Sequence, residues 1–318
     1  MLEACSESKA EEIDRAARIL RAGGLVAFPT ETVYGLGANA LDAEAVGRIY
    51  AVKRRPATSP LIVHVGSIEM AQSLAGNWPE AADRLARKFW PGPLTLVVEK
   101  KAAIPDIVTA GLMTVGLRMP AHPLALALIR AAGVPLAAPS ANRFTELSPT
   151  TAEHVRQSLG DEVALVIDGG PCRVGIESTV LSLAGPEPVL LRPGGISRAQ
   201  LEAIVGPVAV AHDPESGVHP SPGMHRRHYS PRTTLLLLSD GRVPENGLGI
   251  YLKHRHSPSR ADIKVVQMPN AASDYAAALY ENLHQADAAK VDWIAVDEPP
   301  DTPVWEAVRD RLRHAAAK

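Results

Sequence analysis

The feature that most constrains the fold is the alternation of amphipathic helical segments with short apolar segments over the first two-thirds of the chain. Helical periodicity covers residues 10–20, which are followed by Gly23 and Gly24, and residues 43–53. Short apolar segments typical of buried strands lie at residues 25–28, 61–65, 94–98, 114–118, 136–138, 164–167, 179–183 and 189–191. Some of these are separated by helices and others follow one another closely. The pattern therefore predicts one large α/β domain with a twisted mixed sheet over residues 8–205.

Residues 206–232 differ in composition from what precedes them. They contain five prolines and have no clear periodicity, which predicts a linker or a functional loop. Apolar segments at residues 235–238, 248–252, 263–267 and 293–296, with helical segments at 273–286 and 304–313, predict a second domain. We expect residues 233–318 to form a small, Rossmann-like α/β domain with a parallel sheet. It has no glycine-rich phosphate-binding motif, so we expect no catalysis from it.

Charge and cysteine content exclude several classes of protein. The 33 Lys and Arg residues against 35 Asp and Glu residues give a net charge of −2, which argues against a protein whose main role is to coat duplex nucleic acid. Cys5 and Cys172 are too few for a disulfide framework or a structural zinc site. The acidic N-terminus does not resemble a secretory signal, and no apolar segment reaches the roughly 20 residues that span a bilayer. We expect a cytoplasmic protein without membrane contact.

Two early segments combine polar residues with turn-forming residues at strand ends. In Pro29–Thr30–Glu31–Thr32–Val33–Tyr34–Gly35, small residues would let backbone amides approach a ligand, although an ordinary turn is an equally good interpretation. Lys53–Arg54–Arg55 ends a helix, where cations complement the helix dipole; the same residue types are those that bind polyphosphates. His64 follows within an apolar strand, which by default predicts a core histidine.

Later polar residues also follow strands. Ser140 and Asn142 stand in Pro-Ser-Ala-Asn after a strand, where they could cap a helix or hold a ligand; Ser148 fits capping better. Further polar or cationic residues stand at strand ends beside glycine or proline: Arg118, Ser178 and Arg192. Several such groups at successive strand ends could line one pocket. The sequence lacks the Walker, dinucleotide-binding, zincin and nucleophile-elbow motifs, so a site here uses another construction.

Together these segments resemble the threonylcarbamoyl-AMP synthase family of YrdC-like proteins. The resemblance lies in their order along the chain: PTETVYGLG, K-x-R with PLIVH, FWPGPLTLV, LRMP, PSAN with SPT, EST and RPG. It is strong over roughly residues 10–200. The segment SPGMHRRHYSP resembles the linker of the longer, two-domain branch, and the small domain matches that branch in position.

The resemblance implies a reaction and its partners. L-threonine, bicarbonate and ATP would give L-threonylcarbamoyladenylate and pyrophosphate, with Mg²⁺ accompanying ATP and no organic cofactor or dedicated protein metal site. A downstream tRNA threonylcarbamoyl transferase complex would then pass the group to adenosine beside the anticodon. The enzyme would thus be an adenylate-forming nucleotidyltransferase that needs no stable nucleic-acid binding of its own.

The resemblance also implies roles for individual residues. Lys53 and Arg55 would be catalytic and would face phosphate oxygens together with Arg192. The rest of the nucleotide would be held by Ser59, Thr114, Ser140, Asn142 and Ser148, and His228 and Tyr229 would close the linker over ATP. Threonine would be bound by Thr32, His64, Arg118 and Ser178, with Arg118 paired to the α-carboxylate.

Two other functions are compatible with a YrdC-like domain. A double-stranded RNA-binding module is the main alternative, but the net charge and the scarce aromatic residues argue against it. A carbamoyltransferase of the hydrogenase-maturation type would also carry zinc-binding cysteine pairs and an acylphosphatase segment, which this chain lacks.

Overall fold

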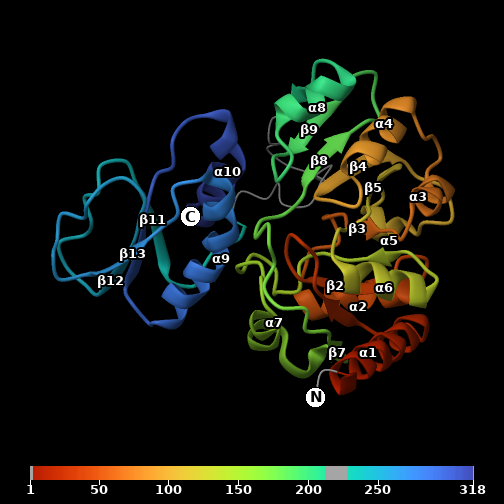
Figure 1. Cartoon of the computed structure of the whole chain (residues 1–318), viewed down its shortest axis with the longest axis horizontal. Helices are drawn as coiled ribbons and strands as arrows, with labels where there is room; N and C mark the ends of the chain where they lie inside the picture. Colours follow the sequence, from red (N-terminus) through yellow and green to blue (C-terminus); the bar gives the residue numbers. More distant parts are fainter. Residues whose placement is uncertain (1–2, 212–227, 318) are drawn as a thin grey trace.

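The computed structural model describes residues 3–211 and 228–317, and it has the predicted two-part α/β architecture (Figure 1). The predicted linker, residues 206–232, falls largely outside the described residues, because only 206–211 and 228–232 belong to them. Within the described part, no helix combines the length and the apolar sequence required to cross a membrane.

The large domain is built on a ten-stranded mixed sheet, in the order β10-β9-β8-β4-β5-β3-β6-β2-β1-β7. Its strands are β1 (Val26–Phe28), β2 (Gly35–Asn39), β3 (Ile62–His64), β4 (Leu94–Glu99), β5 (Thr114–Arg118), β6 (Leu136–Ala137), β7 (Leu165–Val166), β8 (Thr179–Ser182), β9 (Val189–Arg192) and β10 (Ala209–Val210). The sheet contains both parallel pairs, such as β3 with β5, and antiparallel pairs, such as β4 with β5. Non-adjacent stretches of sequence therefore become neighbours in the centre of the sheet.

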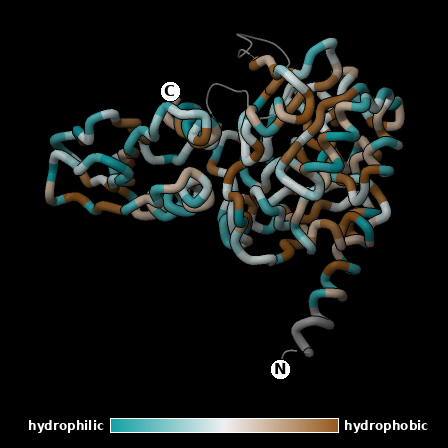
Figure 2. The backbone as a smooth tube through the Cα atoms, turned by 45° about the horizontal axis from the view of Figure 1, so that its top comes forward, coloured by the Kyte–Doolittle hydropathy of each residue, from teal (hydrophilic) through white to brown (hydrophobic). Residues whose placement is uncertain are grey.

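Helices cover this sheet. They are α1 (Glu3–Arg21), α2 (Ala43–Lys53), α3 (Ile68–Leu74), α4 (Glu80–Phe89), α5 (Asp106–Thr109), α6 (Pro123–Ala132), α7 (Ala152–Leu159) and α8 (Arg198–Val205), with a short 3₁₀ turn at Gly160–Glu162. Helices α1 and α6 pack together at one end of the domain, and α4 and α8 at the other (Figure 1). Hydrophobic segments, brown in Figure 2, run through this larger body.

Helix α2 shows how local sequence sets an element that matters for the site. The Asp42 side chain accepts hydrogen bonds from the amides of Glu44 and Ala45 and so caps the N-terminus. Arg54 ends the helix in the left-handed conformation, with φ +52°. The turn directs the chain that follows, including Arg55, toward the strand ends.

The structure differs from the predicted elements of the large domain in three places. Helix α1 begins at Glu3, before the predicted start at residue 10. The first part of the helix was not predicted because the sequence before residue 10 has no apolar periodicity. Strand β2 was not predicted, because glycine disfavours strands; here a Cβ on Gly37 would lie 2.7 Å from the Phe28 ring, so glycine makes room for that ring. Strand β10 pairs with β9, and the large sheet therefore continues past residue 205 to Val210.

The small domain has a four-stranded parallel sheet in the order β11-β14-β12-β13, which confirms the predicted parallel arrangement. Its elements are β11 (Thr234–Leu238), β12 (Gly249–Lys253), β13 (Lys264–Gln267), α9 (Ala272–Ala288), β14 (Trp293–Asp297), a 3₁₀ turn at Pro303–Trp305 and α10 (Glu306–Ala316). Helices α9 and α10 lie between this sheet and the large domain (Figure 1).

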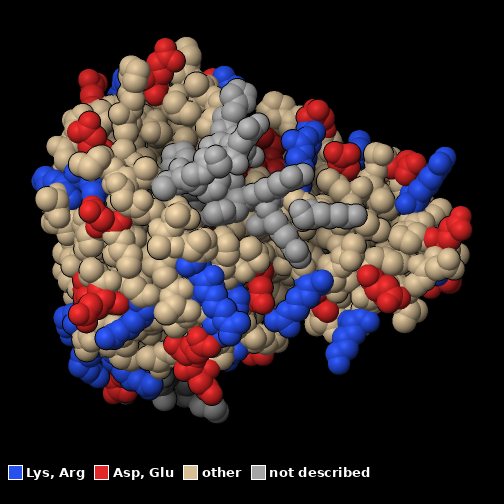
Figure 3. Space-filling view, turned by 180° about the vertical axis from the view of Figure 1, so that it is seen from behind, with Lys and Arg blue, Asp and Glu red and all other residues tan. Residues whose placement is uncertain are grey.

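The two domains share one hydrophobic cluster. Val33, Leu147 and Ile176 of the large domain are buried with apolar residues of α9 and α10, including Leu279 and Leu312. Because these side chains exclude water only when the domains are together, the contact stabilises their docking. On the face seen in Figure 3, basic and acidic side chains of the described residues are interspersed.

Candidate functional site

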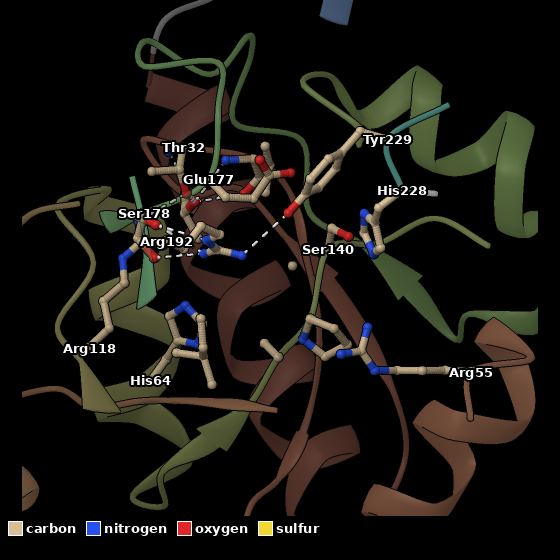
Figure 4. A pocket seen from close by; sticks show the side chains of 16 residues that line it. Thr32, Arg55, His64, Arg118, Ser140, Glu177, Ser178, Arg192, His228 and Tyr229 are labelled. Carbon is tan, nitrogen blue, oxygen red and sulfur yellow. Dashed lines mark hydrogen bonds between the residues drawn. The ribbon is translucent and has the colours of Figure 1, made fainter. Parts of the chain in front are cut away.

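A pocket opens where several strands of the large sheet end, and segments that are far apart in sequence line it (Figure 4). The cavity itself has a volume of about 50 Å³, well below the roughly 300–1,000 Å³ typical of small-ligand sites, so the lining residues must move apart before a ligand of nucleotide size can enter. It brings together these residues singled out from the sequence: Thr32, Arg55, His64, Arg118, Ser140, Ser178, Arg192, His228 and Tyr229. The polar strand-end residues therefore do share one cavity.

Arg118, at the end of β5, is held at the pocket wall by a buried carboxylate. Its Nη2 donates to Glu31 Oε1 at 2.8 Å and to Thr32 Oγ1 at 3.0 Å, and its Nε donates to the Gly92 carbonyl at 3.3 Å. Both side chains of the Arg118–Glu31 pair are 4% exposed. Among the residues that the structure describes, none accepts from Nη1, which leaves this nitrogen able to donate to an anionic ligand.

Thr30 shapes the loop that presents Thr32. Its Oγ1 donates to the Val33 carbonyl at 2.6 Å and accepts from the amides of Thr32 and Val33. The Thr30 and Thr32 hydroxyl oxygens lie 2.9 Å apart. This hydrogen-bonded turn fixes the Thr32 hydroxyl beside Arg118 before any ligand arrives.

His64 ends β3 and is buried at the pocket wall, with its ring edge-on to Phe28 at 6.1 Å between centroids. Burial, and then the nearby Arg118 guanidinium, lower the pKa of His64 to about 3, so the imidazole is neutral at physiological pH. Its Nδ1 has no hydrogen-bond partner among the described residues. A neutral, buried imidazole with an unused nitrogen can hydrogen-bond an uncharged or cationic group of a ligand.

Arg192 and Ser178 form one unit at the ends of β9 and β8. The Arg192 Nε and Nη2 donate to the Ser178 carbonyl at 3.1 and 3.0 Å, and Nη2 also donates to Ser178 Oγ at 3.2 Å. Ser178 Oγ lies 2.8 Å from Thr95 Oγ1. Arg192 Nη1 approaches the Tyr229 hydroxyl at 3.5 Å (Figure 4).

Arg55 enters the pocket from the opposite side (Figure 4). Its Nη2 donates to Ser59 Oγ at 2.6 Å and to the Pro60 carbonyl at 3.1 Å. Its guanidinium lies 5.6 Å from the Phe144 ring centroid, and that ring packs edge-on against His228. Burial lowers the pKa of Arg55 to about 10, which leaves the group charged at neutral pH.

Other residues singled out from the sequence lie behind the pocket or away from it. Lys53 is 1% exposed, and its Nζ donates to the Ser140 carbonyl at 2.6 Å and to the Asn142 carbonyl. Its hydrogen bonds thus go to backbone oxygens of the Pro-Ser-Ala-Asn loop. Lys53 does not line the pocket, where we had predicted that it faces phosphate oxygens. Burial lowers the pKa of Lys53 well below its ordinary value. The physical reason is that the α2 C-terminus lies against this loop, so the nearest acceptors for the lysine are buried carbonyls of the loop.

The remaining predicted nucleotide contacts also serve the protein itself. Ser59 and Ser148 are fully buried; Ser59 supports Arg55, and Ser148 donates to Glu177 Oε1 at 2.5 Å. The Asn142 amide donates to the carbonyls of Arg143 and Glu146. Thr114 lies at the start of β5, opposite Glu99 of β4, beside a separate small cavity. None of the four lines the pocket that holds the other predicted residues.

Two buried acids at the site were not identified from the sequence. Glu31 pairs with Arg118, and Glu177 is buried with Arg311 of the small domain. Each stands beside a residue that was singled out, Thr32 and Ser178. The available signal was the position of each acid beside a strand predicted to be buried. An acid that is buried there needs a cationic or hydrogen-bonding partner.

These pairings bear on the expected Mg²⁺. In the described part of the chain, no group of three or more His, Cys, Asp or Glu side chains is arranged to hold a metal ion. The carboxylates of Glu31 and Glu177 are engaged by arginines. The described side chains therefore do not form a Mg²⁺ ligand set of their own, and Mg²⁺ would have to be bound chiefly by phosphate oxygens.

Comparisons with known proteins cover both domains. A family described as telomere recombination matches residues 18–194, and one described as threonylcarbamoyl-AMP synthase, C-terminal domain, matches residues 196–317. The threonylcarbamoyl-AMP synthase of Bacillus subtilis is 45% identical over 96% of this chain and 93% of its own length. That of Pyrococcus abyssi is 40% identical over 95% of this chain and 93% of its own length. The crystal structure of P. abyssi Sua5 with L-threonine superposes with a TM-score of 0.88 at 38% identity, covering 96% of this chain and 94% of that one.

Proposed function

This chain belongs to the threonylcarbamoyl-AMP synthase family in its two-domain form, and on that premise we propose that it converts L-threonine, bicarbonate and ATP into L-threonylcarbamoyladenylate and pyrophosphate. One observation carries the proposal: three cations, Arg55, Arg118 and Arg192, converge on a single pocket from three separate segments. The carboxylate of an amino acid and a polyphosphate together call for several separate cations. The enzyme would be an adenylate-forming nucleotidyltransferase.

Threonine would occupy the side of the pocket near β3 and β5. Its carboxylate would accept from Arg118 Nη1, the nitrogen that the described residues leave unused. The Thr32 and Ser178 hydroxyls and the neutral His64 ring surround the same region (Figure 4). Because Glu31 and the Thr30 turn already fix Arg118 and Thr32, binding would cost little further ordering of the protein.

The reaction needs charge stabilisation more than it needs a strong base. The threonine ammonium group loses a proton to solvent, and the free amine condenses with bicarbonate: the new N–C bond forms as water leaves, and the resulting carbamate is anionic. A carbamate oxygen then attacks the α-phosphorus of ATP, the bond from that phosphorus to the bridging oxygen breaks, and pyrophosphate leaves with the electron pair. Alignment and neutralisation of the phosphates govern such a step.

We assign the neutralising role to Arg55 and Arg192, which face each other across the pocket (Figure 4). Ser140 lies on the loop between them and would contact the nucleotide. Lys53 would act through this loop, since it holds the Ser140 and Asn142 carbonyls. Ser59 and Ser148 would likewise support the site through Arg55 and Glu177.

His228 and Tyr229 would shield the carbamate from water. Both are buried at the pocket edge, and their rings lie edge-on to one another at 4.1 Å between centroids. A wall of aromatic rings lowers the local water content and so protects a labile intermediate. We further propose that the product passes to a tRNA threonylcarbamoyl transferase complex in the cytoplasm, with Mg²⁺ entering as the ATP complex.

The test is product analysis by mass spectrometry. Purified protein is incubated with L-threonine, MgATP and either ordinary or ¹³C-labelled bicarbonate, with each substrate omitted in turn. The proposal predicts threonylcarbamoyl-AMP, heavier by one mass unit with the label, and an equal amount of pyrophosphate. Pyrophosphate release without the labelled adenylate, or release that does not require threonine, would contradict it.

A further inference from the structure

A buried carboxylate in the pocket wall, that of Glu177, connects the two domains. Glu177 is 6% exposed and belongs to the large domain. Its Oε2 accepts from Arg311 Nε of α10 at 2.6 Å and from the Tyr280 hydroxyl of α9 at 3.1 Å. Its Oε1 accepts from Ser148 at 2.5 Å. Two of these three donors thus come from the small domain, and the next residue after Glu177 is the pocket residue Ser178.

Arg311 reaches three segments that line the pocket. It is fully buried, although arginine is rarely found so without partners. Besides Glu177, its Nη2 donates to the Pro193 carbonyl at 3.0 Å, next to Arg192. Its guanidinium also lies 5.2 Å from the centroid of the Tyr229 ring. A single side chain of the small domain therefore contacts the neighbours of Ser178 and Arg192, and Tyr229 itself.

Tyr229 depends on the small domain in further ways. Its backbone is in the left-handed region, with φ +58°, a conformation that a bulky residue adopts only when its surroundings enforce it. Its ring packs against Tyr280 at 6.0 Å and His314 at 6.4 Å between centroids. The His314 carbonyl also accepts from the amide of His228 at 3.3 Å. Helices α9 and α10 thus hold both aromatic residues at the pocket edge.

The electrostatics of the junction favour the ionised form of Glu177. Burial alone would raise the pKa of Glu177, but the Arg311 and Arg192 guanidinium groups and the Ser148 hydrogen bond outweigh it and leave the pKa below its ordinary value. The carboxylate is therefore ionised, and removal of Arg311 leaves it buried without its principal counter-charge. Such a group either takes up a proton or recovers solvation by movement of its segment, and that movement displaces Ser178.

We propose that Arg311 is a positioning residue through which the small domain holds one wall of the pocket, formed by Ser178, Arg192 and Tyr229, in its binding geometry. It fixes Ser178 through Glu177, the Arg192 segment through the Pro193 carbonyl, and Tyr229 through its ring. The small domain, in which the sequence shows no catalytic motif, then serves to complete a site whose reactive contacts all lie elsewhere. The kinetic part of this inference rests on the proposed function.

The test compares Arg311→Met with Arg313→Met. Arg313 is exposed on the same helix, so its replacement removes the same charge without touching the junction. We expect R311M to raise the KM for L-threonine by roughly tenfold or more through the displaced Ser178, and to lower kcat as well, because the Arg192 segment is no longer held in place to neutralise the phosphates. Amide hydrogen exchange at residues 176–180 and 192–194 should accelerate in R311M, whereas exchange in β14 should not change. R313M should match the wild type in both measurements.

Two further variants keep the inference falsifiable. Should R311M fail to fold, Arg311→Lys retains the charge but loses the forked contact to Glu177 and Pro193, and the same KM increase is expected. Glu177→Gln removes the charge while preserving its shape, and should also raise KM. An R311M protein with unchanged KM and unchanged exchange refutes the inference. So does one that loses thermal stability and kcat together without a KM change, because this is the signature of a purely structural role. If the wild type makes no threonylcarbamoyl-AMP, the proposed function fails, while the exchange comparison still decides the positioning role.

Discussion

Replacing Lys53 with methionine separates two roles that a lysine at this position can have. A lysine that neutralises phosphate in the transition state contributes mainly to turnover. A lysine that satisfies buried carbonyls contributes mainly to stability, and the structure shows Nζ donating to the carbonyls of Ser140 and Asn142. Methionine has a similar shape and length but no donor, so K53M leaves the packing largely intact and removes only the hydrogen bonds.

The expected magnitude follows from those two acceptors. Each buried carbonyl left without a donor costs roughly 1–3 kcal/mol. The loss is partly offset, because the wild type must also bury an ammonium group, as the lowered pKa of Lys53 reflects. We therefore expect K53M to reduce the free energy of unfolding by about 2–4 kcal/mol. For a protein of this size that corresponds to a decrease in Tm of roughly 3–6 °C.

The assay is differential scanning calorimetry beside steady-state kinetics, with Lys101→Met as the matched control. Lys101 is exposed, so K101M should stay within about 0.5 kcal/mol of the wild type. K53M should be clearly less stable. At temperatures below its Tm, any loss of activity should appear as weaker ATP binding, because the Ser140 loop is displaced. A K53M protein that is as stable as the wild type but has a kcat lower by about 10²-fold would refute this reasoning. That result would support a direct contact between Lys53 and the phosphates.

Two further predictions concern the domain junction and pH. Gly175→Ala should lower stability by about 1–3 kcal/mol more than Gly170→Ala, measured by urea unfolding. Both glycines have φ near +75°, but a Cβ on Gly175 would lie 2.5 Å from the α9 backbone, whereas nothing lies within 4 Å at Gly170; equal losses would contradict the close contact. Burial lowers the pKa of His64 to about 3 and that of His284 to about 4. The unfolded chain therefore binds protons first as the pH falls below about 6.5, and stability should decrease by up to about 1.4 kcal/mol per pH unit for each histidine. A flat stability profile between pH 6.5 and 4 would show that these histidines are not held neutral.

Much of the site could be predicted because strand ends are readable in sequence. Apolar segments followed by Pro, Gly and polar residues located Thr32, Arg118, Ser178 and Arg192, and a mixed sheet brings these ends to one pocket. The periodicity of the small domain likewise predicted its parallel sheet correctly. These features depend on local patterns, which a single sequence contains.

What could not be predicted depends on partners distant in the chain. Whether Lys53 faces a ligand or a carbonyl is decided by the loop at Ser140, 87 residues away in sequence. The importance of Glu177 emerges only once Arg311, 134 residues further on, is seen beside it. Strand β2 was missed for a related reason, since glycine there is favoured by the Phe28 ring of the neighbouring strand and not by strand propensity.

The central claim is that the strand-end residues form one binding site for threonine and ATP. It is tested most directly by a crystal structure of the protein soaked with L-threonine and a non-hydrolysable ATP analogue. We predict the threonine carboxylate within hydrogen-bond distance of Arg118 Nη1, and phosphate density between Arg55 and Arg192 in the same pocket. Ligand density in two separate places, or threonine bound away from Arg118, would contradict the claim.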